Sequence, residues 1–106
     1  MKGKMVKIVV FVPEKNAPSL RHVMGEAGVG KVGSTYSHCS FSVKGIGRFL
    51  PLKGAHPTIG QVGKLEEVIE ERIEMVCEKS KLLGVLKAIR AVHPYEEPVI
   101  DVYPLL

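Results

Sequence analysis

Residues 33–63 form a glycine-rich stretch that lies between two segments which resemble each other. The stretch holds six of the eleven glycines and two of the four histidines, so no long helix can run through it. On either side, VVFVPEKN (residues 9–16) aligns with IEMVCEKS (residues 73–80). Each segment has apolar strand-like residues, then Glu-Lys, then a residue typical of helix N-caps. We therefore expect two related halves joined by an elaborated connection.

The first half predicts a strand followed by a helix. Residues 5–12 are mostly β-branched or apolar and end at Pro13, which is typical of a buried strand. Asn16 is the expected N-cap of a helix whose apolar residues recur at helical spacing as far as Gly28.

The next segment, residues 35–43, alternates between apolar and polar residues. This period of two predicts a strand with Cys39, Phe41 and Val43 on its buried face. The frequent glycines and prolines that follow favour a bulged hairpin or an extended loop over residues 45–63.

The second half is ambiguous when it is read alone. Apolar periodicity allows one helix over residues 64–92. The alignment with the first half favours a strand over residues 73–77, extending back toward Ile69, and then a helix capped by Ser80. That helix should end near His93, because the residue before a proline is disfavoured in helical geometry.

A closing strand over residues 99–103 completes the order βαββαβ. This order predicts a ferredoxin-like α+β sandwich, in which two helices cover one face of an antiparallel four-stranded sheet. The other sheet face needs cover, and self-association would provide it. With 106 residues, of which 45% are hydrophobic and 25% are charged, we expect a single domain spanning residues 1–106.

Charge and hydropathy narrow the classes of partner. The net charge is +4, but the basic residues are scattered and no aromatic residues interleave with them, so nucleic acid is not an expected partner. The apolar run of residues 8–12 is too short for a membrane span or a signal peptide, and we expect a cytoplasmic protein without a membrane partner. Cys39 and Cys77 lack CxxC spacing and are expected to be buried thiols.

Residues 93–98, HPYEEP, are the most unusual short run. One interpretation is structural, since a histidine can bond to the last carbonyls of a helix and the prolines fix the path into the closing strand. The other is a ligand site between protomers formed by His93, Tyr95 and Glu96. Imidazole, phenol and carboxylate together supply donors, acceptors and metal ligands.

The histidines offer a further candidate site. His38 could pair with His56 or His93 across the glycine-rich loop, so these three histidines are candidate ligands for a divalent transition metal. His38 is also a candidate residue for binding a small ligand. The alternative is that they are ordinary surface histidines. The glycines at 45 and 47 lack the context of a phosphate-binding loop.

Two pairs of residues could serve in catalysis, Cys39 with His38 and Glu96 with His93. Adjacent strand residues point to opposite faces, which argues against the first pair, and helix termination explains the second. We therefore expect no catalysis, with a small hydrolase as an alternative.

Three motifs carry a resemblance to a known family. They are SHCSF at residues 37–41, the run G-x-F-x-P-L-x-G-A-x-P-x-I-G-x-V-G-K-L-E at residues 47–66, and HPYEE at residues 93–97. Together, over residues 6–105, they resemble the PII-like, CutA-like domain inserted in bacterial Nif-three-like proteins (NGG-one-interacting factor three-like, the YqfO group), here in a stand-alone form. One departure is His56, where the family pattern has asparagine.

The resemblance implies a trimeric signalling or ion-handling module. Full-length Nif-three-like proteins carry a dinuclear metal site in their other domain, and that site is not carried over to this chain. We expect a small oligomeric regulatory or ligand-sensing module, most simply a homotrimer. A divalent-metal-binding protein of the CutA ion-tolerance type is the alternative.

Overall fold

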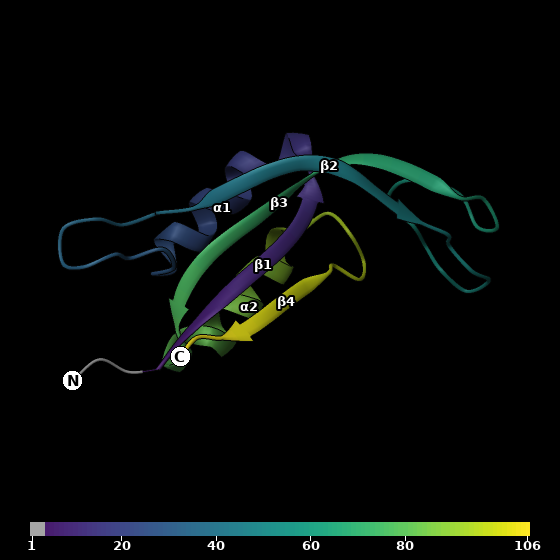
Figure 1. The fold of residues 1–106 in the computed structure, drawn as a ribbon. Helices are drawn as coiled ribbons and strands as arrows, with labels where there is room; N and C mark the ends of the chain where they lie inside the picture. Colours follow the sequence, from purple (N-terminus) through teal and green to yellow (C-terminus); the bar gives the residue numbers. More distant parts are fainter. Residues whose placement is uncertain (1–3) are drawn as a thin grey trace.

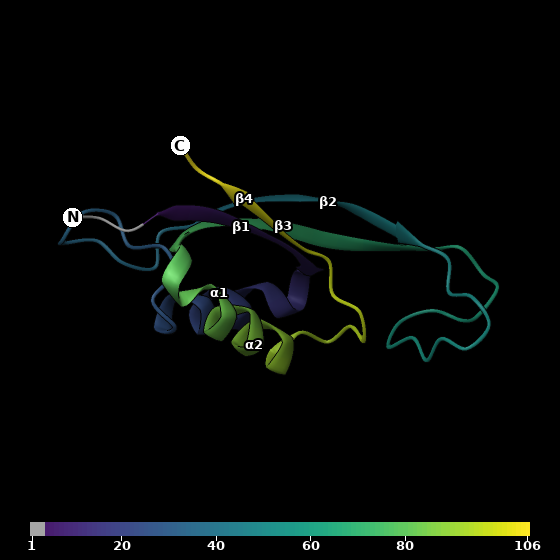
Figure 2. The same ribbon diagram turned by 90° about the horizontal axis from the view of Figure 1, so that it is seen from below.

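The computed structural model describes residues 4–106 and contains a four-stranded sheet with two helices packed on one face (Figure 1 and Figure 2). The strands are β1 (Met5–Pro13), β2 (Phe41–Phe49), β3 (Glu66–Glu78) and β4 (Ile100–Pro104), and the helices are α1 (Ala17–Glu26) and α2 (Leu82–Val92). A 3-10 turn precedes each helix, η1 (Glu14–Asn16) before α1 and η2 (Lys79–Lys81) before α2. The predicted order is confirmed, and the segment that periodicity allows as one long helix is split into β3 and α2.

The strands lie in the order β2-β3-β1-β4, and each neighbouring pair is antiparallel. The predicted ferredoxin-like sandwich is therefore confirmed. β1 lies in the centre, paired with β3 from Met5 opposite Glu78 to Pro13 opposite Glu70. Its pairing with β4 brings the two ends of the described chain side by side, where the Leu105 N–H donates to the Met5 carbonyl oxygen at 3.0 Å.

The core lies between the sheet and the helices. Alternate residues of the two central strands point at the helices, as the period of two requires. Each fully buried aliphatic side chain contributes about 1.5–3 kcal/mol relative to exposure. Of the two cysteines, Cys77 is buried as predicted, whereas Cys39 is only half-buried. The largest buried core side chains are Ile8, Val10 and Val12 of β1, Ile73 and Met75 of β3, Leu20 and Met24 of α1, and Val85 and Ile89 of α2.

β2 differs from the prediction in its start and in the face that it presents to the core. Cys39 precedes the strand, which runs through both glycines of the GxG sequence. Phe41 and Val43 pair with Glu74 and Arg72 on the face away from the helices, and they are 65% and 50% exposed. The prediction that Cys39, Phe41 and Val43 face the core is therefore wrong. Alternation identifies an apolar face, but it does not tell which face the helices cover.

The predicted helix caps are partly right. Gly28 follows α1 with a left-handed φ of 97°, as expected of a helix stop. Asn16 takes the N-cap position of α1 but makes no side-chain cap hydrogen bond. Ser80 lies inside η2, and Lys81 takes the N-cap position of α2, so that prediction is wrong. In both places a 3-10 turn precedes the helix, and the cap residue has helical rather than extended backbone angles.

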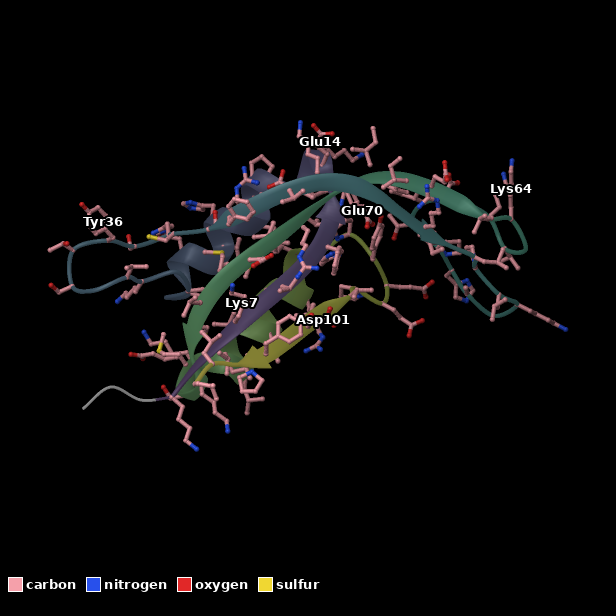
Figure 3. The ribbon with its side chains drawn as sticks, viewed as in Figure 1. Lys7, Glu14, Tyr36, Lys64, Glu70 and Asp101 are labelled. Atoms are coloured by element: carbon pink, nitrogen blue, oxygen red, sulfur yellow. The ribbon has the colours of Figure 1, made fainter. Side chains whose placement is uncertain are left out.

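The molecule is elongated, with extents of 50 × 23 × 23 Å. Residues 27–40, here called the distal loop, lie at one end of the long axis with Tyr36, and residues 50–65, the connection, lie at the other end with Lys64 (Figure 3). Within residues 4–106, no helix has the length and apolar character needed to cross a membrane.

Candidate functional site

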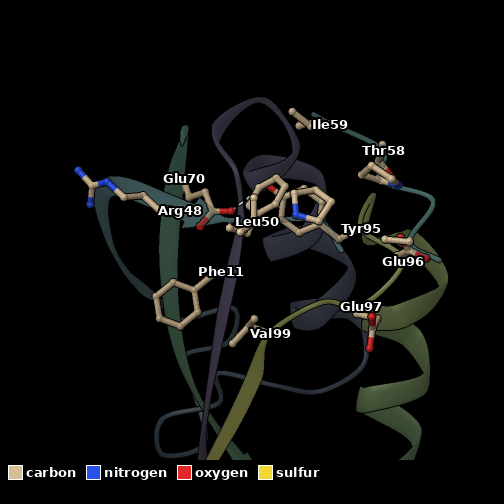
Figure 4. A pocket seen from close by; sticks show the side chains of 15 residues that line it. Phe11, Arg48, Leu50, Thr58, Ile59, Glu70, Tyr95, Glu96, Glu97 and Val99 are labelled. Carbon is tan, nitrogen blue, oxygen red and sulfur yellow. Dashed lines mark hydrogen bonds between the residues drawn. The ribbon is translucent and has the colours of Figure 1, made fainter. Parts of the chain in front are cut away.

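A cleft of about 420 Å³ lies where the connection meets the end of the sheet and residues 93–98, here called the HPYEEP turn (Figure 4). This size is within the usual range for small-molecule sites. Most of the wall is apolar or aromatic, and the polar groups are few. The lining residues are Phe11, Gly47, Arg48, Phe49, Leu50, Pro51, Ala55, Pro57, Thr58, Ile59, Glu70, Tyr95, Glu96, Glu97 and Val99.

His93 anchors the HPYEEP turn beneath this cleft. It ends α2 with an extended backbone, ψ 133°, because Pro94 follows it. Its ring points inward, and Nε2 lies 2.7 Å from the Phe11 carbonyl oxygen while Nδ1 accepts from the Tyr95 N–H at 3.1 Å. These two bonds fix the neutral tautomer with its proton on Nε2. Burial lowers the pKa of His93, against smaller opposing effects of the Phe11 carbonyl and the Glu70 charge.

Tyr95 and Glu70 form the polar floor of the cleft. The Tyr95 hydroxyl donates to Glu70 Oε2 at 2.8 Å, and the Tyr95 ring meets the Phe49 ring edge to face at 5.9 Å between centroids. Burial, and then the hydrogen bond and charge of Glu70, raise the pKa of the Tyr95 phenol. Tyr95 therefore remains a protonated donor, directed at a carboxylate within an apolar wall.

Gly47 makes the room that Glu70 needs. A Cβ atom built on Gly47 would lie 1.9 Å from Glu70 Oε1 and 2.4 Å from its Cδ. Glu70 pairs with Gly45 across the β2–β3 ladder, so its side chain leans along the strand onto the next glycine of the same face. The GxG sequence thus allows a side chain to cross β2.

Two hydrogen bonds hold the connection against the HPYEEP turn. The His56 N–H donates to Glu96 Oε2 at 2.8 Å, and the Thr58 hydroxyl donates to the Pro94 carbonyl oxygen at 2.6 Å. His56 thus contributes through its backbone, and its side chain is exposed.

The predicted site residues separate into two groups. Tyr95 and Glu96 line the cleft and His93 supports it, which places the predicted ligand residues of the HPYEEP turn together. His38 lies in the distal loop, at the other end of the molecule from the connection that carries His56. The structure therefore does not bring His38, His56 and His93 together.

Sequence reasoning missed Glu70 and Gly47. Glu70 belongs to a run of glutamates that resembles a solvated face, and Gly47 resembles a bulge. The register of β2 and β3 brings these two residues together, and this register cannot be read from a single sequence.

The chain is similar in sequence to longer bacterial proteins. Proteins named GTP cyclohydrolase 1 type 2 homolog from Mycobacterium tuberculosis and Bacillus subtilis are each 48% identical to it, over 100 and 99 residues. These matches cover 94% and 93% of this chain but only 26% of each relative, so the chain spans about a quarter of their length. No family model matches the chain.

Comparison with solved structures also finds a longer bacterial protein of which this chain resembles one segment. A Bacillus cereus protein related to NIF3 is 45% identical, with a TM-score of 0.85, and the match covers 99% of this chain and 26% of that one. The divalent cation tolerance protein CutA from Archaeoglobus fulgidus is 18% identical, with a TM-score of 0.69, over 95% of this chain and 83% of that one. The second match shows a shared fold. These findings confirm the resemblance carried by SHCSF, the run of residues 47–66 and HPYEE.

Proposed function

We propose that this chain, a homologue of one segment of the NIF3-related proteins with the fold of CutA, is a small ligand-sensing module that acts as a homo-oligomer. The observation that carries the proposal is the cleft between the connection and the HPYEEP turn. It combines apolar walls with a few convergent polar groups, which is the usual composition of a small-molecule site.

The chemistry of the lining indicates the class of ligand. Glu70, Glu96 and Glu97 supply carboxylates, while Arg48, the one cation among the described lining residues, is paired with Glu67 at 2.6 Å. Three carboxylates among aromatic and aliphatic walls favour a ligand with a flat apolar body and a cationic or hydrogen-bond-donating group. The same carboxylates disfavour a triphosphate, although the relatives' name refers to GTP.

The hydrogen bonds between the two segments that flank the cleft support a sensing role. Two hydrogen bonds join the connection to the HPYEEP turn, from His56 and from Thr58. A ligand that contacts both Ile59 and Tyr95 favours the closed arrangement over an open one, and the difference in its affinity for the two arrangements sets the size of the response.

The uncovered sheet face supports self-association, with a trimer as the specific proposal. Phe41 and Val43 are exposed there beside Arg72, whose guanidinium lies 5.5 Å from the centre of the Phe11 ring. A second copy of the chain would remove these apolar side chains from water.

A ligand screen tests the proposed function. Aromatic amines, nucleosides and GTP are added to the purified protein while the melting temperature (Tm) is followed. We expect an aromatic amine or a nucleoside to raise the Tm of the wild type and to raise that of Tyr95→Phe less. The control is Tyr36→Phe, which changes an exposed tyrosine of the distal loop and should respond like the wild type. The proposal fails if no compound of either class raises the Tm, or if Tyr95→Phe responds fully.

A further inference from the structure

Three side chains with metal-binding atoms meet at the C-terminal end of α1, far from the cleft. His22 and Glu26 are four residues apart and share one exposed face of the helix. His38 reaches them from the distal loop, and its Nε2 lies 2.8 Å from Glu26 Oε2. One ligand atom from each of the three residues lies within 4.8 Å of the others.

The backbone of His38 is held in an uncommon conformation. Its φ is 59°, the one positive φ among the described residues other than glycine. For a residue with a side chain this left-handed geometry costs about 1–2 kcal/mol. Backbone strain of this kind persists where the surrounding structure fixes it, and it is common at ligand sites. Here it aims the imidazole of His38 at the helix.

A glycine in α1 leaves space for this imidazole. A Cβ atom on Gly25 would lie 2.0 Å from Cδ2 of His38 and 2.7 Å from its Nε2. Glycine costs a helix about 1 kcal/mol relative to alanine. The helix therefore carries a residue that is unfavourable in a helix interior at the point where the ring of His38 packs against it.

The second ring nitrogen of His38 also has a partner. Ser37 Oγ lies 2.9 Å from Nδ1. When Nδ1 carries the proton and donates it to Ser37, the lone pair of Nε2 is free and points toward Glu26 and His22. Metal-binding histidines usually have such a partner on the other nitrogen, which fixes their tautomer and orientation.

We propose that His22, Glu26 and His38 bind one divalent transition-metal ion, with Zn²⁺ as the best match. Two imidazoles and one carboxylate form a common three-residue zinc set, and a water molecule completes the tetrahedron. Ligands about 2.0–2.1 Å from a tetrahedral ion lie about 3.4 Å apart, so the exposed His22 and Glu26 need only small changes of rotamer. When the ion binds, the hydrogen bond between His38 and Glu26 is replaced by one bond from each of these residues to the metal.

This site differs from the one expected from the sequence. It retains His38, but its partners are two residues of α1 instead of His56 and His93. It shares no residue with the cleft, so the test of this metal site is independent of the test of ligand sensing.

Zinc and cobalt titrations of the untagged full chain test this site. Calorimetry should give one Zn²⁺ per chain, and Co²⁺ should produce the visible absorption bands of a four-coordinate site. His22→Asn and Glu26→Gln should each weaken Zn²⁺ binding by at least the factor of about 10–100 known for loss of a supporting residue. Gly25→Ala should also weaken binding, since its methyl group displaces the imidazole of His38 while alanine favours the helix.

The control is His56→Ala, which removes an exposed histidine at the opposite end of the molecule. It should bind Zn²⁺ like the wild type. Because His22 and Glu26 are exposed, their variants should fold, and circular dichroism checks this. The site is wrong if the wild type does not saturate with Zn²⁺ below millimolar concentration. It is also wrong if folded His22→Asn and Glu26→Gln bind like the wild type, or if His56→Ala loses binding.

Discussion

At the scale of single residues, the cleft depends on one glycine in the middle of a strand. Glycine in a strand interior weakens the strand, because it adds backbone entropy to the unfolded chain and packs no side chain. Gly47 offsets this cost by allowing Glu70 to cross β2 and accept the hydrogen bond of Tyr95.

Gly47→Ala should destabilise the protein by about 1–3 kcal/mol. The added methyl group displaces the Glu70 carboxylate and leaves the Tyr95 hydroxyl without its partner. Urea unfolding measures this change. Gly45→Ala is the matched control, because Gly45 lies on the same face of β2 and a Cβ there meets nothing within 4 Å. We expect a change within about 0.5 kcal/mol for that control. Equal losses in the two variants would contradict the role of Gly47.

His93 makes stability depend on pH in a defined direction. Burial lowers its pKa in the folded protein below the ordinary value of 6.5, so the unfolded chain takes up a proton first on acidification. The free energy of unfolding should therefore fall as the pH drops below about 6.5, by up to about 1.4 kcal/mol per pH unit, until the folded pKa is reached. Above that window His93 adds no pH dependence.

Urea unfolding of the wild type and of His93→Gln between pH 5 and 7.5 measures this effect. Glutamine removes the titrating group, so its curve should be flatter in the acid range whatever its absolute stability. If the slopes of the two curves are the same, His93 does not titrate as described.

At the scale of elements, the fold is the part that the sequence predicts well. The order of strands and helices follows from the match between residues 9–16 and residues 73–80, which overrides the helical periodicity after Lys64. The faces of β2 do not follow from it, since Phe41 and Val43 form an apolar face that the helices leave uncovered. Of the residues that line the candidate cleft, Tyr95 and Glu96 could be singled out from the sequence because the HPYEEP run is unusual in composition. Glu70 and Gly47 could not, because their meeting depends on the register of β2 and β3.

The connection should open when its hydrogen bond to the HPYEEP turn is removed. Glu96→Ala deletes the acceptor of the His56 N–H, and bonds to charged acceptors contribute about 1.5–3 kcal/mol. Hydrogen exchange at the His56 amide should therefore accelerate about tenfold or more, with little change at the amides of β1. Glu97→Ala is the matched control, because no described hydrogen bond joins Glu97 to the connection. Unchanged exchange in Glu96→Ala would show that this bond does not hold the connection.

At the scale of the whole molecule, residues 4–106 cover one face of the sheet with helices and leave the other face uncovered. The uncovered face carries an ion-pair network, in which Glu74 bonds to Lys7 at 3.2 Å and to Arg72 at 3.1 Å, and both partners lower the pKa of Glu74. Apolar side chains of β2 lie beside this network. Such a mixed surface resembles a protein–protein interface, whose core is apolar and whose rim is polar.

Light scattering should show three copies of the 11.6 kDa chain in the native particle. Val43→Glu should shift the mass toward the monomer, because it introduces a carboxylate into the apolar part of the uncovered face. Leu83→Glu is the control, since Leu83 is 82% exposed on α2, on the other side of the molecule, and the assembly should survive. A monomeric wild type, or equal effects of the two variants, would contradict association through this face.

Because the two chain ends lie close together, this fold can be inserted into a larger protein with little disturbance. β1 and β4 are neighbours, and the Leu105 N–H bonds to the Met5 carbonyl. Neighbouring strands lie about 4.8 Å apart, so a surface loop of a larger protein must part by only about that distance to accept the whole sheet as an insertion. For the same reason, a short peptide between the ends allows circular permutation without breaking a strand pair.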